Sequence, residues 1–242
     1  MRIALVGPER WSADGHVNFD GIEGVVPAGV DVVLLPELVG SSLARGEYLE
    51  RLRGLAAETE ATVVGGSYYD RTEAGVVNRG AVVDPRGEVV AEYDKVHPYG
   101  VEQQTGVIPG APSHGFELLG RRAQVLLCAD LWYSGSLARL ADPVDVVLVP
   151  AFSVTQWGTP LPARTLWEHM SVARAYEFMT YVAVSDWHHE ATYHGHPCAG
   201  VTGLANPCPT TGVFFTPGAT VHDLDFPRLT AFRADRATRN FR

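Results

Sequence analysis

The chain has 242 residues, of which 46% are hydrophobic and 19% charged, with a formal net charge of -9 at pH 7. This composition is that of an ordinary globular protein and excludes a polar, disordered chain. The negative charge argues against binding to nucleic acids or anionic membranes, because both partners are negative themselves. We expect a single domain over residues 1–242, in which 225–242, with Arg233, Arg236, Arg239 and Arg242, is a surface or dimer-contact tail.

The N-terminal segment and the cysteines indicate the cellular compartment of the protein. MRIALVG runs directly into a strand pattern, without the features of a secretory signal, and no run approaches membrane-spanning length. The cysteines Cys128, Cys198 and Cys208 are odd in number and resemble no metal knuckle in their spacing. We therefore predict a cytoplasmic protein with free thiols and with no nucleic-acid or membrane partner.

Apolar runs and helical periodicity predict the order of the elements. Short β-branched runs bounded by Gly, Pro or Asp indicate buried strands at 3–6, 32–36, 62–66, 76–83, 125–128 and 146–150. Helical patterns occupy 43–59, 135–142 and 164–179, and a Gly/Pro-rich β region spans 181–224. In the last helix the expected buried face carries Leu166, Met170, Ala173 and Phe178. Two central sheets flanked by helices fit this order.

Three chemically distinct side chains come at the ends of predicted strands. Glu37 follows VVLLP, Lys95 follows VVAEYD, and Cys128 ends AQVLLC. Alone, each has an ordinary structural interpretation as a solvated strand end or an inert buried thiol. Because sites form where strand ends in a parallel-type sheet face a crevice, we expect these side chains to form a site there.

Thiol chemistry supplies a reason for this combination. A cysteine thiol, with a reference pKa of about 8.5, is mostly protonated at neutral pH, so as a nucleophile it needs a base and a nearby cation. Glu37 can be the base. Lys95 can stabilise the oxyanion that forms when sulfur attacks an amide carbon, with the backbone N–H of Ala129 as the expected second donor.

Four sequence blocks carry a resemblance to a known family. They are MRIALVG, DVVLLPELVG, GEVVAEYDKVHPYGVE and VLLCADLWYS. In order and spacing they resemble the nitrilase, or carbon-nitrogen hydrolase, superfamily over nearly the whole chain. Further matches are Asn78 with the hairpin GAVVDPRGEVV, IPG at 108–110, and ARAYEF at 173–178.

The resemblance implies an α/β fold, a four-layer α-β-β-α sandwich, and hydrolysis through a thioester without a metal or organic cofactor. It also implies a homodimer or higher homo-oligomer, and a second glutamate in the loop after the lysine, which is the place of Glu102. The expected function is that of a thiol-dependent hydrolase, which cleaves the C–N bond of a small carboxamide through a thioester on Cys128.

After Cys128 the chain departs from the family pattern and reads ADLWYSG. Compared with the family, it lacks the basic residues that hold a carboxylate in N-carbamoyl substrates, and the Trp-Glu pair of nitrile-cleaving members. An amide is therefore the expected substrate. Trp132, Tyr133 and Phe152, with Trp157, are expected to rim its pocket, and packing in the core or at a dimer contact is the alternative.

Two other functions stay open from the sequence. An acyl transferase would pass the acyl group from the same thioester to an amine, and a catalytically silent binding protein would keep only the fold. The histidine-rich stretch 188–196 carries possible metal ligands. We predict a polar loop there and no metal, and the physiological substrate is left open.

Overall fold

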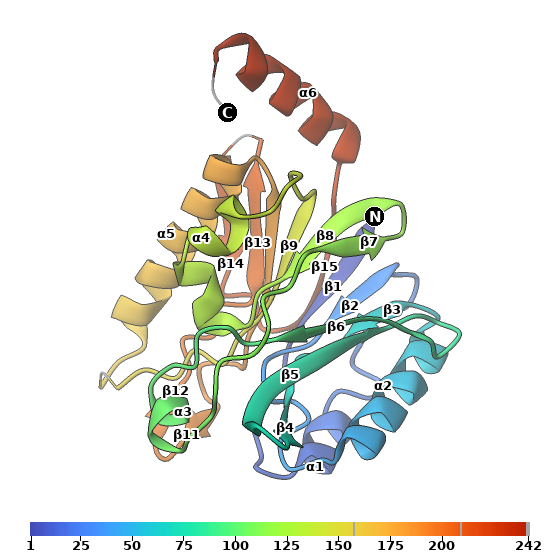
Figure 1. The fold of residues 1–242 in the computed structure, drawn as a ribbon, viewed down its shortest axis with the longest axis vertical. Coiled ribbons are helices and arrows are strands. Elements are labelled where there is room, and N and C mark those ends of the chain that lie inside the picture. The colour runs from blue at the N-terminus through green and yellow to red at the C-terminus, as the bar shows by residue number, and fades with distance from the viewer. Residues whose placement is uncertain (157, 209, 241–242) are drawn as a thin grey trace.

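The computed structural model describes residues 1–156, 158–208 and 210–240, and two β-sheets form its centre (Figure 1). The first sheet contains β1 (Arg2–Gly7), β2 (Val32–Leu34), β3 (Thr62–Val64), β4 (Tyr68–Thr72), β5 (Gly75–Val83), β6 (Val89–Asp94) and β15 (Gly218–Asp223). Its order is β15-β1-β2-β3-β5-β4, and β6 pairs with β5.

The second sheet contains β7 (Phe116–Leu118), β8 (Arg121–Val125), β9 (Val146–Pro150), β10 (Tyr181–Ser185), β13 (Gly203–Pro207) and β14 (Thr210–Phe214). Its order is β14-β13-β10-β9-β8-β7. A small ribbon pairs β11 (Thr192–Tyr193) with β12 (His196–Pro197). Both large sheets have parallel strands at the centre and antiparallel strands at the margins.

Helices cover the outer face of each sheet (Figure 1). On the first sheet lie α1 (Gly15–Asp20) and α2 (Arg45–Thr59), and on the second lie α4 (Gly135–Ala138) and α5 (Leu161–Phe178). The connections carry α3 (Val101–Gln104) and the 3-10 helix η1 (Cys128–Trp132), and the chain continues into α6 (Phe226–Thr238). The architecture is the expected four-layer α-β-β-α sandwich.

Three apolar layers hold the sandwich together. Between the two sheets, Leu34 of β2 and Leu148 of β9 belong to one buried cluster. A second cluster joins the first sheet to α2, and a third joins the second sheet to α5. Strands buried on both faces need apolar residues at every position, which explains the unbroken runs in β2 and β9.

Two of the predicted elements differ from the structure. The strand predicted over 125–128 ends with β8 at Val125, and Cys128 instead begins η1. In α5, the face predicted to be buried is wrong: Leu166 is 42% exposed, whereas Trp167, Ser171 and Ala175 are buried. When apolar residues lie on several sides of a helix, their pattern does not determine which side is buried. The surface against which the helix packs decides this.

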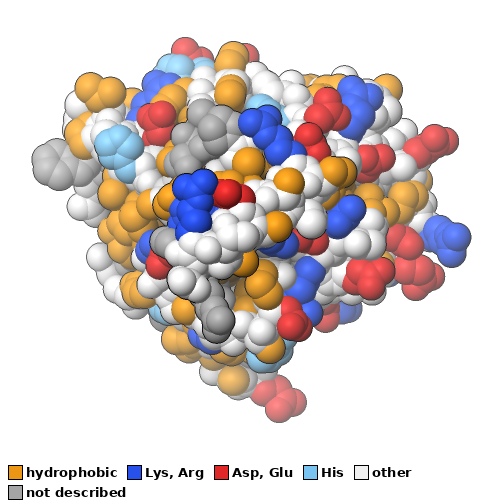
Figure 2. All heavy atoms as spheres, turned by 90° about the horizontal axis from the view of Figure 1, so that it is seen from above, with side chains coloured by type: hydrophobic (Ala, Val, Ile, Leu, Met, Phe, Trp, Pro, Cys, Tyr) orange, Lys and Arg blue, Asp and Glu red, His pale blue; other side chains and the backbone are white. Residues whose placement is uncertain are grey.

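Within the segment 225–242, residues Phe226–Thr238 form the helix α6, which projects at the top of Figure 1. The side chains of Phe226 and Leu229 are buried, which anchors the first turns of α6. Seen from above in the orientation of Figure 1, basic and acidic side chains are interspersed on the surface (Figure 2).

Arg242 lies outside the described residues. Among those described, no helix combines the length and apolarity needed to cross a bilayer.

Arg233 of α6 contacts three residues, two just before β9 and one just after α5. Its guanidinium lies 2.7 Å from an oxygen of Asp145 and donates to the carbonyls of Val144 and Met179 at 2.6 and 2.9 Å. By contrast, the ion pair of Arg239 with Asp235 joins side chains that are 71% and 52% exposed.

We predict that Arg233→Ala destabilises the fold by about 1.5–3 kcal/mol, the usual contribution of hydrogen bonds to a charged group. Arg239→Ala, the control, should change stability by no more than about 0.5 kcal/mol, because an exposed pair within one helix contributes little. Urea unfolding of both variants measures the difference. Equal effects would show that Arg233 does not fix α6 to the body.

Candidate active site

Glu37 lies where the strand ends of both sheets converge. Three residues after β2, its backbone N–H donates to the carbonyl of Ala151, just beyond β9, at 3.2 Å. The indole of Trp187, which follows β10, donates to the Glu37 carbonyl at 2.8 Å. The carboxylate itself is 3% exposed. Contacts with the second sheet therefore fix a residue that the first sheet supplies.

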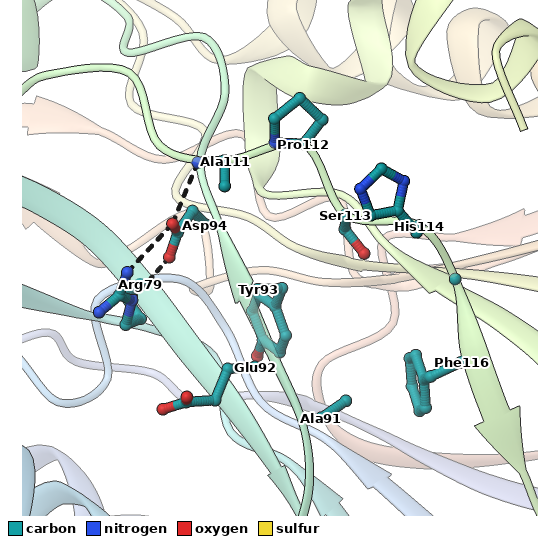
Figure 3. Close-up of a pocket in the computed structure, with 11 residues that line it drawn as sticks. Arg79, Ala91, Glu92, Tyr93, Asp94, Ala111, Pro112, Ser113, His114 and Phe116 are labelled. Atoms are coloured by element: carbon teal, nitrogen blue, oxygen red, sulfur yellow. Dashed lines mark hydrogen bonds and ion pairs between the residues drawn. The ribbon is translucent and has the colours of Figure 1, made fainter.

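Lys95 follows β6 and is held by contacts on both sides. Its N–H donates to the carbonyl of Asn78 at 2.8 Å, and its carbonyl accepts from Gly110 at 2.9 Å. A Cβ at Gly110 would overlap the side chain of Asp94, so this approach requires glycine. Figure 3 shows how Asp94 is tied to Arg79 and to the N–H of Ala111 beside a cavity of about 370 Å³.

Cys128 is the first residue of η1 and has a φ of 49°, in the left-handed region. A residue other than glycine in that conformation is strained by about 1–3 kcal/mol, and such strain concentrates at functional sites. The side chain is buried, and its sulfur lies 3.9 Å from the carbonyl of Phe152. Glu37 and Lys95 both lie close enough to the thiol to shift its pKa, Glu37 upward and Lys95 downward.

A single ammonium joins the buried acids. Lys95 Nζ lies 2.7 Å from Glu37 Oε1 and 2.5 Å from Glu102 Oε2. Glu102, on α3, is 8% exposed at its side chain, and it also accepts from the N–H of Tyr99 at 3.0 Å. The structure thus brings the four residues predicted from the sequence, Glu37, Lys95, Glu102 and Cys128, into one buried cluster.

Asn78 has a larger part in this cluster than the sequence indicated. Its Nδ2 donates to Glu37 Oε1 at 2.9 Å and to Glu102 Oε1 at 2.7 Å. The residue is fully buried in the middle of β5. The sequence indicates Asn78 only through the family resemblance, because a mid-strand asparagine does not show which groups its side-chain amide meets.

Burial and charge set the protonation of the cluster. Burial raises the pKa of Glu37 to about 7, although Lys95 opposes the shift and Glu102 adds to it. Burial would lower the pKa of Lys95, but Glu37 and the other nearby acids hold it well above its usual value. Burial and then Glu37 raise the pKa of the Cys128 thiol. The resting cluster therefore pairs a protonated thiol with a carboxylate that can take its proton near neutral pH.

The three residues predicted to contact a substrate fall in two places. Phe152 lies beside Cys128, and its ring packs against Trp11 at 5.2 Å between centroids. Trp132 and Tyr133, at the end of η1, line a different cavity of about 410 Å³. Trp157 lies outside the described residues.

The histidine-rich stretch 188–196 forms a loop and the ribbon of β11 and β12. His188 lies 3.9 Å from a carboxylate oxygen of Glu190. Within the described part of the chain, no group of three or more histidine, cysteine or acidic side chains is arranged to hold a metal ion.

Comparisons with known proteins match a family model and several relatives. Residues 2–196 match the model described as carbon-nitrogen hydrolase. The omega-amidase YafV of Escherichia coli strain BL21-DE3 is 32% identical over 197 residues, which cover 76% of this chain and 73% of that protein.

Two solved structures extend the comparison to the fold. An amidase variant from Nesterenkonia sp. AN1, which carries acrylamide added to its active-site cysteine, is 25% identical, with a TM-score of 0.75 and coverage of 100% of both chains. A CN-hydrolase superfamily protein from Xanthomonas campestris is similar in fold, with a TM-score of 0.80 at 22% identity over 97% of this chain and 94% of that one.

The bridging amide leads to a prediction about stability. In Asn78→Ala, both carboxylates lose a donor, which should destabilise the fold by about 1.5–3 kcal/mol when they are ionised. Burial raises the pKa of Glu37 in the folded protein to about 7. The buried carboxylate therefore destabilises the fold increasingly as the pH rises from its ordinary pKa of 4.5 to about 7, and losing the Asn78 donor strengthens this trend.

Urea unfolding at about pH 5 and pH 8 measures the effect, and the deficit of Asn78→Ala should be larger at the higher pH. Asn18→Ala is the matched control, because Asn18 is also buried but its amide donates to the backbone carbonyls of Ser12 and Val39. Its deficit should not change with pH. A constant deficit for Asn78→Ala would contradict the bridging role.

Proposed function

The chain belongs to the carbon-nitrogen hydrolase family and is an amidase-like member of it, and from this premise we propose that it hydrolyses a small carboxamide through a thioester on Cys128. The observation that carries the proposal is the Lys95 ammonium bonded to both Glu37 and Glu102 within the cluster that contains Cys128. The names of the relatives, omega-amidase and amidase, support an amide rather than a nitrile or an N-carbamoyl substrate.

In the first step the sulfur of Cys128 attacks the amide carbon. The thiol proton passes to Glu37, whose pKa of about 7 suits a base that works near neutral pH. Phe152 supports this geometry, because its carbonyl is in contact with the sulfur and orients it. The products of the attack are a carbon–sulfur bond and a negative charge on the former carbonyl oxygen.

Two donors would stabilise that oxyanion in this mechanism. Lys95 stays a cation because its pKa is held well above its usual value, and it adds no proton transfer of its own. The backbone N–H of Ala129 lies in the first turn of η1, where N–H groups have no acceptor within the helix. The first backbone N–H of η1 that donates to a preceding carbonyl is that of Asp130, to Leu127 at 3.0 Å, and Ala129 comes just before it.

The remaining steps reuse Glu37. Its acquired proton passes to the departing nitrogen, the C–N bond breaks, and ammonia leaves a thioester on Cys128. Glu37 then takes a proton from water, which attacks the thioester, and the acid product leaves as the thiol is restored. Glu102 acts through its bond to Lys95, which it holds beside Glu37.

The expected cytoplasmic location, the homodimer and the single-domain organisation stay predictions. Leu161 and Leu166 of α5 are 65% and 42% exposed, which supports an association through this helix.

Replacing Lys95 tests the proposed oxyanion stabilisation. Lys95→Met should release ammonia from butyramide at least about a hundredfold more slowly than the wild type, as expected for the loss of one positioned donor. Circular dichroism of the variant controls for folding. Hydroxylamine added to the wild-type reaction tests for acyl transfer, because a transferase would pass the acyl group to this amine instead of to water. A folded Lys95→Met variant with normal turnover would remove Lys95 from the mechanism.

The protonation of Glu37 predicts the pH profile. Because the base must be ionised, kcat/KM for butyramide should rise with pH along a limb with an apparent pKa of about 7 and then level off. The limb belongs to Glu37 and Lys95 as an interacting pair rather than to Glu37 alone. A rate that is independent of pH between about 5 and 8 would exclude Glu37 as the base.

A further inference from the structure

A buried acid lies just beyond β10, outside the cluster around Lys95. Asp186 is fully buried, and its carboxylate accepts three hydrogen bonds. The donors are the N–H of Ser153 at 3.1 Å, the hydroxyl of Ser153, and the N–H of Val201 at 2.9 Å. Within the described part of the chain, none of its partners is a lysine, an arginine or a histidine. The mechanism proposed above uses neither Asp186 nor Ser153.

A carboxyl group at this fully buried position is unfavourable by itself. Burial raises the pKa of Asp186, and the hydrogen bonds from Ser153 and Val201 oppose the shift. Without a cation, only such hydrogen bonds offset the loss of water around the group. An amide of the same shape would not replace it, because Oδ1 meets the N–H of Ser153 and Oδ2 meets the N–H of Val201. The position therefore requires a group that accepts at both of its ends.

The N–H of Ser153 belongs to the same peptide group as the carbonyl of Phe152. A trans peptide is planar, so its N–H and its C=O point in opposite directions. Asp186 holds this peptide group by the N–H, and the carbonyl on the other side contacts the sulfur of Cys128 at 3.9 Å. One planar group thus connects the buried acid to the proposed nucleophile.

The neighbours of Asp186 hold this connection in place. The hydroxyl of Ser153, which donates to Asp186, also accepts from the N–H of Ala199 at 2.9 Å. The next residue of the chain is Trp187, whose indole donates to the carbonyl of Glu37 at 2.8 Å. Two consecutive residues therefore contact the segments that carry the proposed base and the carbonyl behind the nucleophile.

We propose that Asp186 is a positioning residue, which orients the sulfur of Cys128 toward the amide carbon by fixing the peptide group between Phe152 and Ser153. Asp186 acts through this peptide group and not on the substrate. The consequence for amide hydrolysis rests on the proposed function. The orientation of the peptide group does not depend on it.

Crystal structures of variants test the positioning without turnover. In Asp186→Asn the amide places a donor against an N–H group, so the peptide group before Ser153 should rotate and its carbonyl should lose contact with Cys128. Asp186→Ser, too short to reach the N–H of Ser153, should have the same effect without opposing two donors. Ser185→Ala is the matched control, because Ser185 is also fully buried but its hydroxyl donates to the carbonyl of Val6. In this control the peptide group should stay as in the wild type.

Acylation of Cys128 by butyramide in a quenched single turnover measures the effect on the reaction. A misplacement of about 1 Å can slow a reaction about a hundredfold, and we expect acylation to slow about tenfold or more in Asp186→Asn and Asp186→Ser. Since the loss concerns the attack and not binding, kcat and kcat/KM should fall by the same factor. Ser185→Ala should acylate like the wild type.

Alkylation by iodoacetamide separates the orientation of the sulfur from its ionisation. The pKa of the Cys128 thiol is raised by burial, by Glu37 and, to a smaller extent, by Asp186. Removing the acid in Asp186→Asn does not hinder thiolate formation, so Cys128 should react with this small reagent at least as fast as in the wild type, although acylation is slow. Cys208, a half-buried free thiol, gives the reference rate in the same sample.

An unrotated peptide group in both Asp186 variants, or acylation at the wild-type rate in both, would overturn the positioning role and leave the proposed hydrolysis standing. Alkylation of Cys128 that slows as much as acylation would also overturn it, because the defect would then lie in the thiol itself. Conversely, a rotated peptide group in the variants of a protein that releases no ammonia from any amide would keep the positioning role and contradict the proposed hydrolysis.

Discussion

One buried ammonium, shared by two carboxylates, is the interaction on which the rest of this structure depends. Burying a charge is unfavourable unless it is paired, and removing one partner from a buried pair typically costs about 3–5 kcal/mol. Lys95 therefore requires Glu37 and Glu102, and the amide of Asn78 joins the same two acids. The elements β2, β5 and α3 and the segment after β6 must meet at one point to satisfy these groups.

The same constraint gives the cluster its chemical capacity. Burial raises the pKa of Glu37 to about 7 and keeps the Cys128 thiol protonated, while the acids keep Lys95 charged. The Cys128 proton can therefore pass to Glu37, while the positive charge stays on Lys95. The 3-10 helix η1 connects this cluster to the neighbouring cavity, because it begins at Cys128 and ends at Trp132.

The strands that lead to Glu37 and Lys95 could be predicted from the sequence, but their last residues and the contacts between them could not. The runs before Glu37 and Cys128 are apolar beyond the points where β2 ends at Leu34 and β8 at Val125, so their pattern does not show where pairing stops. Asn78 lies inside a strand, where alternation indicates a face but not the groups that it meets. The buried side of α5 depends on the shape of the second sheet, which selects Trp167 and the polar Ser171 over a more apolar face.

The central claim is that the acyl group is carried by Cys128, and a quenched single turnover with a small amide tests it most directly. Mass analysis of the peptides should locate the acyl group on the peptide that contains Cys128, and Cys128→Ala should form neither adduct nor product. The chain holds two further free thiols, Cys198 and Cys208, which serve as internal controls. An acyl group on either of these, or full turnover by Cys128→Ala, would contradict the account.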